Sequence, residues 1–160
     1  MTRPSTDLIT VRYRQADEWI AARLKVPTTT PVIYRLQHIS TGSEVRKIQE
    51  TWLPASIAAD TPLAEQVKAE GDICHQLLNL GHILATAEET IQSRTPSQDE
   101  AKTLSLVERG SPVLEVDRTI FDSNSRVVAA QHIIAAADRV HGPRARQLLR
   151  PRGRARRRGR

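Results

Sequence analysis

Two charged residues stand between large apolar residues in segments that alternate as β-strands do. Glu50 lies between Ile48 and Trp52, and Arg118 is flanked in the same way by two aliphatic residues. Because residues two apart on a strand share a face, each charge would point to an apolar side, where it is costly unless it is paired. We therefore predict that Glu50 and Arg118 line a ligand pocket, in which Arg118 holds an anionic group such as a carboxylate or a phosphate.

The alternative for this pair is a purely structural role. Glu50 and Arg118 would then satisfy each other or a backbone group, or would lie on a partly wet face. Trp52 shares the predicted face of Glu50 and is a further candidate ligand contact, with packing in the core as its alternative.

Arg94 and Arg35 are candidate ligand contacts on other segments. Arg94 immediately precedes Thr95, a predicted helix N-cap, and the free backbone amides of that helix start could hold an anion. The alternative there is capping alone. Arg35 lies on a predicted strand whose other face is more apolar, so a solvated arginine is the alternative to a ligand contact.

Patterns typical of catalysis or of a bound cofactor are absent from the sequence. We find no glycine-rich phosphate loop, nucleophile elbow or dinucleotide fingerprint, and the five histidines lack the spacing of metal ligands. Cys74 is the only cysteine, which excludes an internal disulfide and a cysteine zinc cluster. We therefore predict a protein that is not an enzyme and that holds no metal and no cofactor.

The net charge of +6 is concentrated at one end of the chain. Residues 143–160 contain nine arginines and no acid, so residues 1–142 carry 15 basic and 18 acidic side chains, a net charge of −3. We predict that residues 140–160 form a disordered tail, because they have too little apolar surface to offset the cost of ordering. An alternative is a generic domain whose arginine-rich tail binds nucleic acid.

Composition and length indicate one globular domain. The chain of 160 residues is long enough for a single core, and its apolar content of 39% is within the range of such domains. No apolar run approaches the roughly 20 residues that a membrane-spanning helix requires, and the first residues lack the apolar stretch of a signal peptide. The sequence therefore predicts a cytoplasmic protein without a membrane partner.

Apolar periodicity and turn residues predict where helices and strands lie. Helices are expected over about residues 16–24, over 73–80, and after the N-cap Thr95. Strands are expected over about residues 32–39, 45–53, 87–94, 113–121 and 127–135. Residues 1–15 are expected to be a flexible N-terminal segment.

Two parts of the chain repeat one arrangement. Each has a short helix, a proline at the strand entry (Pro31 or Pro112), and two strands joined by a polar turn. Two such helix-plus-hairpin units around one antiparallel sheet, with flanking helices, predict an α+β fold. Neither half has enough apolar surface to be stable alone, so we predict one domain over residues 16–139.

Several short motifs follow one another between residues 16 and 139. The first half carries TPV at residues 30–32 and QETWLPA at 49–55. The second half carries ETIQSRTPS at 89–97, LSL at 104–106, GSPVLEVDRT at 110–119 and ADR at 137–139. In order and spacing these motifs resemble the UTRA (UbiC transcription regulator-associated) domain, the effector-binding module of bacterial GntR-family regulators of the HutC subfamily.

The resemblance implies a chorismate lyase-like fold and a ligand sensor that controls DNA binding and transcription without chemistry of its own. It implies that Arg35 and Gln131 lie near ligand positions of the family, whereas Ala129 stands where some members have a glutamate. The effector would be a small, anionic metabolite. The alternative that this fold leaves open is a chorismate lyase-like enzyme.

The resemblance also implies partners. UTRA domains follow a winged helix-turn-helix, and no such pattern precedes residue 16. We therefore expect operator DNA to be bound only through an N-terminal domain that this chain lacks. Such regulators use two paired DNA-binding domains, one from each subunit, so we also expect a homodimer.

Overall fold

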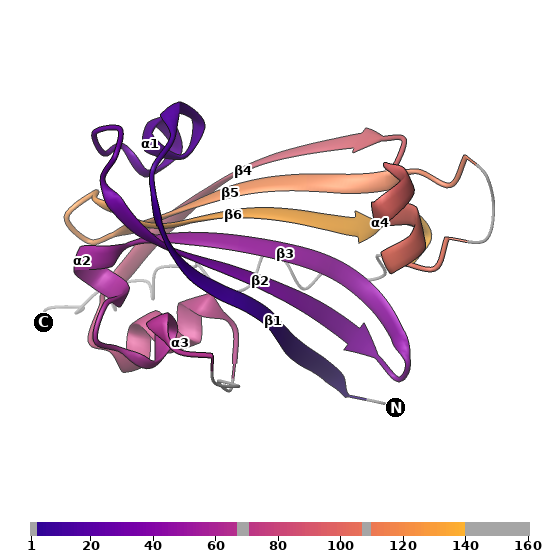
Figure 1. Cartoon of the computed structure of the whole chain (residues 1–160), viewed down its shortest axis with the longest axis horizontal. Helices are drawn as coiled ribbons and strands as arrows, with labels where there is room; N and C mark the ends of the chain where they lie inside the picture. Colours follow the sequence, from indigo (N-terminus) through magenta and orange to yellow (C-terminus); the bar gives the residue numbers. More distant parts are fainter. Residues whose placement is uncertain (1–2, 67–70, 107–109, 140–160) are drawn as a thin grey trace, which may run out of the picture.

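The structure, a computed structural model, describes residues 3–66, 71–106 and 110–139. Within these ranges one antiparallel sheet of six strands, in the order β1-β2-β3-β6-β5-β4, forms the centre (Figure 1). The strands are β1 (Pro4–Gln15), β2 (Pro31–Thr41), β3 (Glu44–Pro54), β4 (Leu84–Arg94), β5 (Val113–Asp122) and β6 (Val127–Ala136). The helices are α1 (Glu18–Leu24), α2 (Ala55–Ala58), α3 (Ile73–Asn79) and α4 (Gln98–Thr103), with short 3₁₀ helices η1 (Pro62–Ala64) and η2 (Ala137–Arg139). None of these helices combines the length and the apolar character that crossing a bilayer requires.

Both predicted hairpins are present, and they share one sheet. Strand β2 pairs with β3, and β5 pairs with β6. Pairing of β3 with β6, from Lys47 opposite Ala135 to Trp52 opposite Ala130, joins the two hairpins. The predicted α+β fold with an antiparallel sheet of two helix-plus-hairpin units is therefore confirmed.

The N-terminal segment differs from the prediction. Residues 1–15 were expected to be flexible, but Pro4–Gln15 forms β1 and pairs with β2 along its length. Sequence pattern misses this strand because it lies at the sheet edge, where Arg12, Tyr13 and Arg14 are all exposed and mark no apolar face. The predicted tail, residues 140–160, lies outside the described residues.

Helix α4 begins later than the sequence predicts. Ser97, not Thr95, is the N-cap: its hydroxyl accepts a hydrogen bond from the backbone N–H of Glu100 at 3.2 Å. In return, the Glu100 carboxylate accepts from the Ser97 N–H at 2.8 Å, which completes a capping box. The same carboxylate accepts from both terminal nitrogens of Arg94, at 2.7 and 2.8 Å. Glu100 therefore ties the start of α4 to the end of β4.

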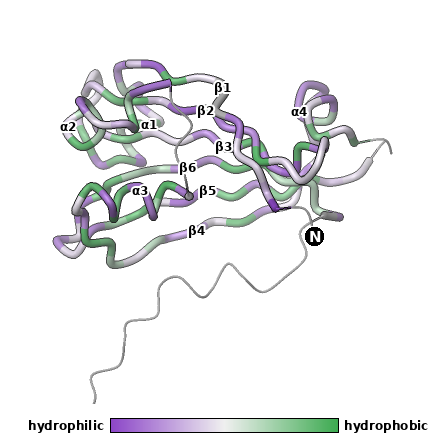
Figure 2. Tube along the Cα trace, turned by 90° about the horizontal axis from the view of Figure 1, so that it is seen from below, coloured by the Kyte–Doolittle hydropathy of each residue, from purple (hydrophilic) through white to green (hydrophobic). Residues whose placement is uncertain are grey.

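The sheet has two faces, and different helices cover them. One face, which we call the α3 face, carries Ile33 and Leu53, and these pack with Leu77 of α3. Figure 2 shows α3 on this side, over β5 and β6. The other face, which we call the α1 face, carries Trp52, which packs with Ile20 of α1. Each face thus has its own apolar cluster against its own helix.

Two neighbouring leucines of α3 test this packing. Leu77 is fully buried, whereas Leu78 is 53% exposed. We expect Leu77→Ala to lower the free energy of unfolding by about 2–5 kcal/mol, because it leaves a cavity under α3. Leu78→Ala, the matched control, should change it by less than about 0.5 kcal/mol. Urea denaturation measures both, and equal effects would contradict the packing of α3 on the sheet.

The Glu100 contacts predict how stability responds to acid. Hydrogen bonding from Arg94 lowers the pKa of Glu100 below its ordinary value of 4.5. The unfolded chain then takes up this proton before the folded one, so the stabilisation is complete above pH 4.5 and is lost as the pH falls through the lowered pKa. We expect Glu100→Gln to lose less stability than the parent between about pH 5 and about pH 3. Urea denaturation across this range measures it, and an unchanged pH dependence would show that the pairing contributes nothing.

Candidate functional site

Polar residues form a row across the α3 face. Arg35 of β2 is opposite Thr51 of β3, and Thr51 is opposite Gln131 of β6. Gln131 is in turn opposite Arg118 of β5, and Arg118 is opposite Glu89 of β4. We call these residues the polar row. Since cross-strand partners point to the same face, the row unites Arg35, Arg118 and Gln131, three of the residues predicted as ligand contacts.

Hydrogen bonds link the polar row from β3 to β4. The side-chain amide of Gln131 donates to Thr51 Oγ1 at 3.2 Å, and Arg118 Nη1 donates to Gln131 Oε1 at 3.2 Å. Arg118 Nε also donates to Glu89 Oε1 at 2.6 Å, which forms an ion pair. Thr51 and Gln131 are buried, so these bonds fix the direction of the Gln131 amide. Glu89 balances the charge of Arg118.

Arg35 is the most deeply buried charge of the row. Only 1% of the residue is exposed, and Val11 of β1 and Thr51 of β3 flank it. Its Nη1 donates to the carbonyl oxygen of Leu63 in η1, whereas its Nη2 is buried without a hydrogen-bond partner among the described residues. This burial lowers the pKa of Arg35. The alternative of a solvated arginine is wrong, because the face of β2 that carries Tyr34 is the less buried one.

Two buried amides lie next to Arg35 along the strands. Gln37 of β2 is opposite Gln49 of β3, and Gln49 Nε2 donates to Gln37 Oε1 at 3.4 Å. The two residues are only 8% and 9% exposed. Polar groups buried in an ordinary core are costly, so their concentration beside Arg35 distinguishes this part of the α3 face from a packing surface.

Sequence reasoning did not single out Thr51, Gln37 or Gln49. Alternation shows that Gln49 and Thr51 share one side of β3, and that Arg35 and Gln37 share one side of β2. It does not show which sides of the two strands coincide, because this depends on the pairing register.

Glu50 lies on the α1 face, away from the polar row. The register of β3 with β6 puts Glu50 opposite His132, whereas the adjacent Thr51 is opposite Gln131. Glu50 and Arg118 therefore point to different sides of the sheet. The prediction that Glu50 and Arg118 line one pocket is therefore wrong.

On the α1 face, Glu50 and Trp52 have protein partners. The hydroxyl of Tyr34 donates to Glu50 Oε1 at 2.7 Å, and burial together with this bond raises the pKa of Tyr34. Trp52 is 6% exposed and packs edge-on against Trp19, with ring centroids 5.2 Å apart. These contacts favour the structural alternatives that the sequence left open for Glu50 and Trp52.

Arg94 is also engaged within the protein. Besides its two hydrogen bonds to Glu100, its Nε lies 3.2 Å from Glu115 Oε1. The bond to Glu100 raises the pKa of Arg94. Because Ser97 and Glu100 satisfy backbone donors at the start of α4, capping accounts for this helix start.

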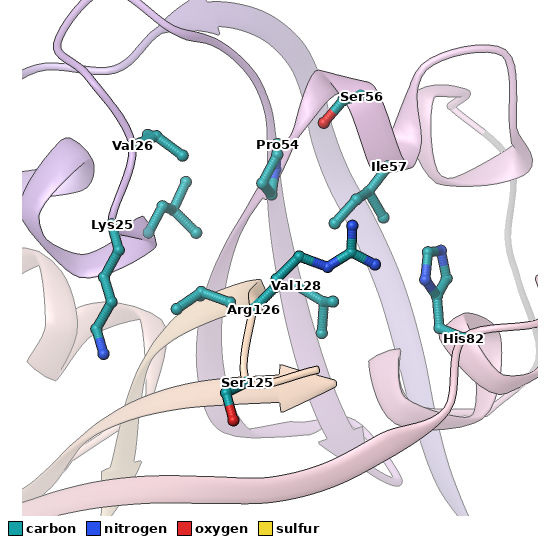
Figure 3. Close-up of a pocket in the computed structure, with 11 residues that line it drawn as sticks. Lys25, Val26, Pro54, Ser56, Ile57, His82, Ser125, Arg126 and Val128 are labelled. Carbon is teal, nitrogen blue, oxygen red and sulfur yellow. The ribbon is translucent and has the colours of Figure 1, made fainter. Parts of the chain in front are cut away.

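A separate hollow lies at one end of the sheet, between α1, α2 and the β5–β6 turn (Figure 3). Its volume is about 560 Å³, and it is lined by Leu24, Lys25, Val26, Pro54, Ser56, Ile57, His82, Ser125, Arg126, Val127 and Val128. None of the residues predicted as ligand contacts is among these. The hollow and the polar row are therefore distinct features of the molecule.

Solved structures of bacterial regulators share this fold. PhnF from Mycobacterium smegmatis has a TM-score of 0.77 and 21% identity; the match covers 86% of this chain and 60% of the PhnF chain. The effector domain of the same protein gives a TM-score of 0.75 and 21% identity, covering 86% of this chain and 83% of the domain. A GntR-family transcriptional regulator from Bacillus cereus gives a TM-score of 0.73 and 17% identity, covering 88% and 96%. This chain thus spans only about three-fifths of the PhnF chain.

Comparison of the sequence with families gives a direct assignment. A search of the curated proteins found no matching sequence. The model of the UTRA domain, in contrast, matches residues 2–141, which include the whole sheet with its edge strand β1. From this match over most of its length, the chain belongs to the UTRA domain family.

Proposed function

We propose that this chain is the effector-binding part of a GntR-family, HutC-type transcription regulator, and that its effector is a small anion held by Arg35 in the polar row. The observation that carries the proposal is the buried guanidinium of Arg35, whose Nη2 has no partner among the described residues. Two of the similar structures support the sensor role, since one is the effector domain of PhnF and another is a GntR-family transcriptional regulator.

An unpaired buried charge is costly, and an anionic ligand would remove that cost. Burial disfavours the charged form of Arg35, and the contact with the Leu63 carbonyl supplies a dipole but no opposite charge. Arginine keeps its proton in proteins, so it cannot escape the cost by neutralisation. A carboxylate or phosphate beside Nη2 would supply both the missing acceptor and the missing charge.

The other residues of the polar row would contact the uncharged part of the effector. Arg118 is balanced by Glu89, so Arg35 is the residue of the row with an unbalanced positive charge. Thr51 and Gln131 present a hydroxyl and an amide, which can bind hydroxyl or amide groups of a ligand. The row therefore fits a small polar metabolite with a single anionic group.

Effector binding would change the affinity for DNA by moving segments that lie next to the polar row. Arg35 holds the Leu63 carbonyl of η1, so a ligand that competes for the guanidinium would change how η1 sits on the sheet. A ligand shifts a conformational equilibrium only by its difference in affinity for the two states. We propose that this shift moves the DNA-reading heads of a cytoplasmic homodimer, which contact operator DNA through a domain outside this chain.

Turnover by a chorismate lyase-like reaction is the competing function. The polar row offers arginine, threonine and glutamine, which bind and orient, and its carboxylate, Glu89, is held by Arg118. We therefore propose binding without turnover. Incubation of the purified chain with chorismate distinguishes the two, since formation of a hydroxybenzoate product would favour the enzyme.

Thermal unfolding with simple anions tests the role of Arg35. At roughly 100 times Kd, the best of inorganic phosphate, sulfate and citrate should raise the Tm of the parent by roughly 5–10 °C. Arg35→Gln should remove this shift while leaving the ligand-free Tm similar or higher, because it removes a buried charge. Arg12→Gln, an exposed arginine on the adjacent edge strand, is the matched control and should keep the shift. A shift that survives Arg35→Gln would contradict the proposal.

Adjacent residues on opposite faces give a second test. Thr51→Val removes a hydroxyl of the polar row and should weaken binding of the same anion about fivefold, the effect of one hydrogen bond worth about 1 kcal/mol. Glu50→Gln, one position away on the α1 face, should leave Kd within about twofold. Isothermal titration measures both. The reverse order of effects would mean that the ligand lies on the α1 face.

A further inference from the structure

The hollow at the end of the sheet is lined by none of the residues of the polar row, so the proposed effector site does not account for it (Figure 3). We propose that it is a second binding site, for a small organic anion with an apolar body. Its volume of about 560 Å³ is within the roughly 300–1,000 Å³ typical of ligand pockets.

The walls of the hollow are apolar and come from separate parts of the chain. Val26 follows α1, Pro54 and Ile57 lie where β3 passes into α2, and Val127 and Val128 begin β6. Pro54, Val127 and Val128 are buried residues of the folded core, so this part of the wall is held by packing. Such a surface favours a ligand with aromatic or aliphatic carbon rather than a bare ion.

Basic residues also line the hollow. Lys25, His82 and Arg126 line it, together with the hydroxyls of Ser56 and Ser125, and no acidic residue is among the lining residues. In Figure 3 the Arg126 side chain extends across the hollow toward Ile57 and His82. An anionic head group would therefore meet positive charge and hydroxyl donors within a hollow that also has apolar walls.

Arg126 is held in place by a neighbouring carboxylate. Its Nε and Nη2 lie 3.0 and 2.9 Å from Asp122 Oδ2, and Asp122 also accepts from the backbone N–H groups of Asn124 and Arg126. This pairing offsets the charge of Arg126, so Lys25 leaves one positive charge in excess. Lys25 is placed by the left-handed backbone at the end of α1, with φ of 54°, and its Nζ lies 4.8 Å from the centre of the Phe121 ring.

The hollow and the polar row would select different ligands. The polar row surrounds a buried arginine with amides and a hydroxyl, whereas the hollow combines exposed cations with apolar walls. A compound with a large apolar body and one negative charge therefore fits the hollow and not the row. Anilinonaphthalene sulfonate has this composition and becomes fluorescent in apolar surroundings, which makes it a suitable probe.

Fluorescence titration of the full chain with anilinonaphthalene sulfonate tests the site. We expect saturable binding by the parent and a Kd about fivefold higher for Lys25→Gln and for Arg126→Gln, the effect of losing one exposed charge contact. Ser56→Phe keeps every charge but fills the hollow from an exposed position of α2, and it should abolish the saturable signal.

Two matched controls locate the binding. Lys47→Gln removes an exposed lysine from β3 outside the hollow, and Arg35→Gln removes the charge of the polar row; both should leave Kd within about twofold. Absence of saturable binding to the parent would overturn the proposal. So would an unchanged Kd in Ser56→Phe, or an equal loss in Lys47→Gln, which would mean non-specific attraction to positive charge. A loss confined to Arg35→Gln would place the probe in the polar row and also refute the second site.

Discussion

The buried guanidinium of Arg35 is the constraint on which the site depends. It lies inside the sheet face that α3 covers, with one terminal nitrogen on the Leu63 carbonyl and the other without a partner among the described residues. Taking a charge out of water without an opposite charge costs free energy, so packing elsewhere must offset that cost. The apolar cluster of Ile33, Leu53 and Leu77 lies on the same face of the sheet as Arg35 and contributes to this packing. In the proposed function, an anionic effector supplies the missing acceptor and the missing opposite charge.

The pairing of β3 with β6 joins the two hairpins into one sheet with a continuous polar row. It places Thr51 opposite Gln131 and so continues the row from Arg35 on the first hairpin to Arg118 on the second. A shift of one residue in this register would bring Glu50 and its β2 partner Leu36 to the row in place of Thr51 and Arg35. The register of β3 with β6 therefore determines whether Arg35 lies on the same face as Gln131 and Arg118.

Much of the fold could be predicted from the sequence, and less of the site. Apolar periodicity and turn residues predict both hairpins and helices α1 and α3. These elements can be predicted because each pattern lies within one short segment of the chain. The sequence misses edge strand β1 because Arg12, Tyr13 and Arg14 are exposed and show no apolar alternation. It places the start of α4 at Thr95 because two capping patterns overlap there. The sequence singles out Arg35, Arg118 and Gln131, which the structure brings to one face, but it also groups Glu50 with Arg118. Alternation orders residues within a strand, whereas register orders them between strands.

Locating an anion directly in crystals tests the central claim. Crystals of the chain soaked in selenate would be measured at the selenium absorption edge, where the anion gives an anomalous signal. The account predicts a selenium peak beside Arg35 Nη2, placed so that a selenate oxygen lies about 3 Å from this nitrogen, within hydrogen-bonding distance, and no such peak in crystals of Arg35→Gln. Selenate bound only at exposed arginines, with a protein carboxylate on Arg35, would contradict the account, because the buried charge would then be compensated without a ligand.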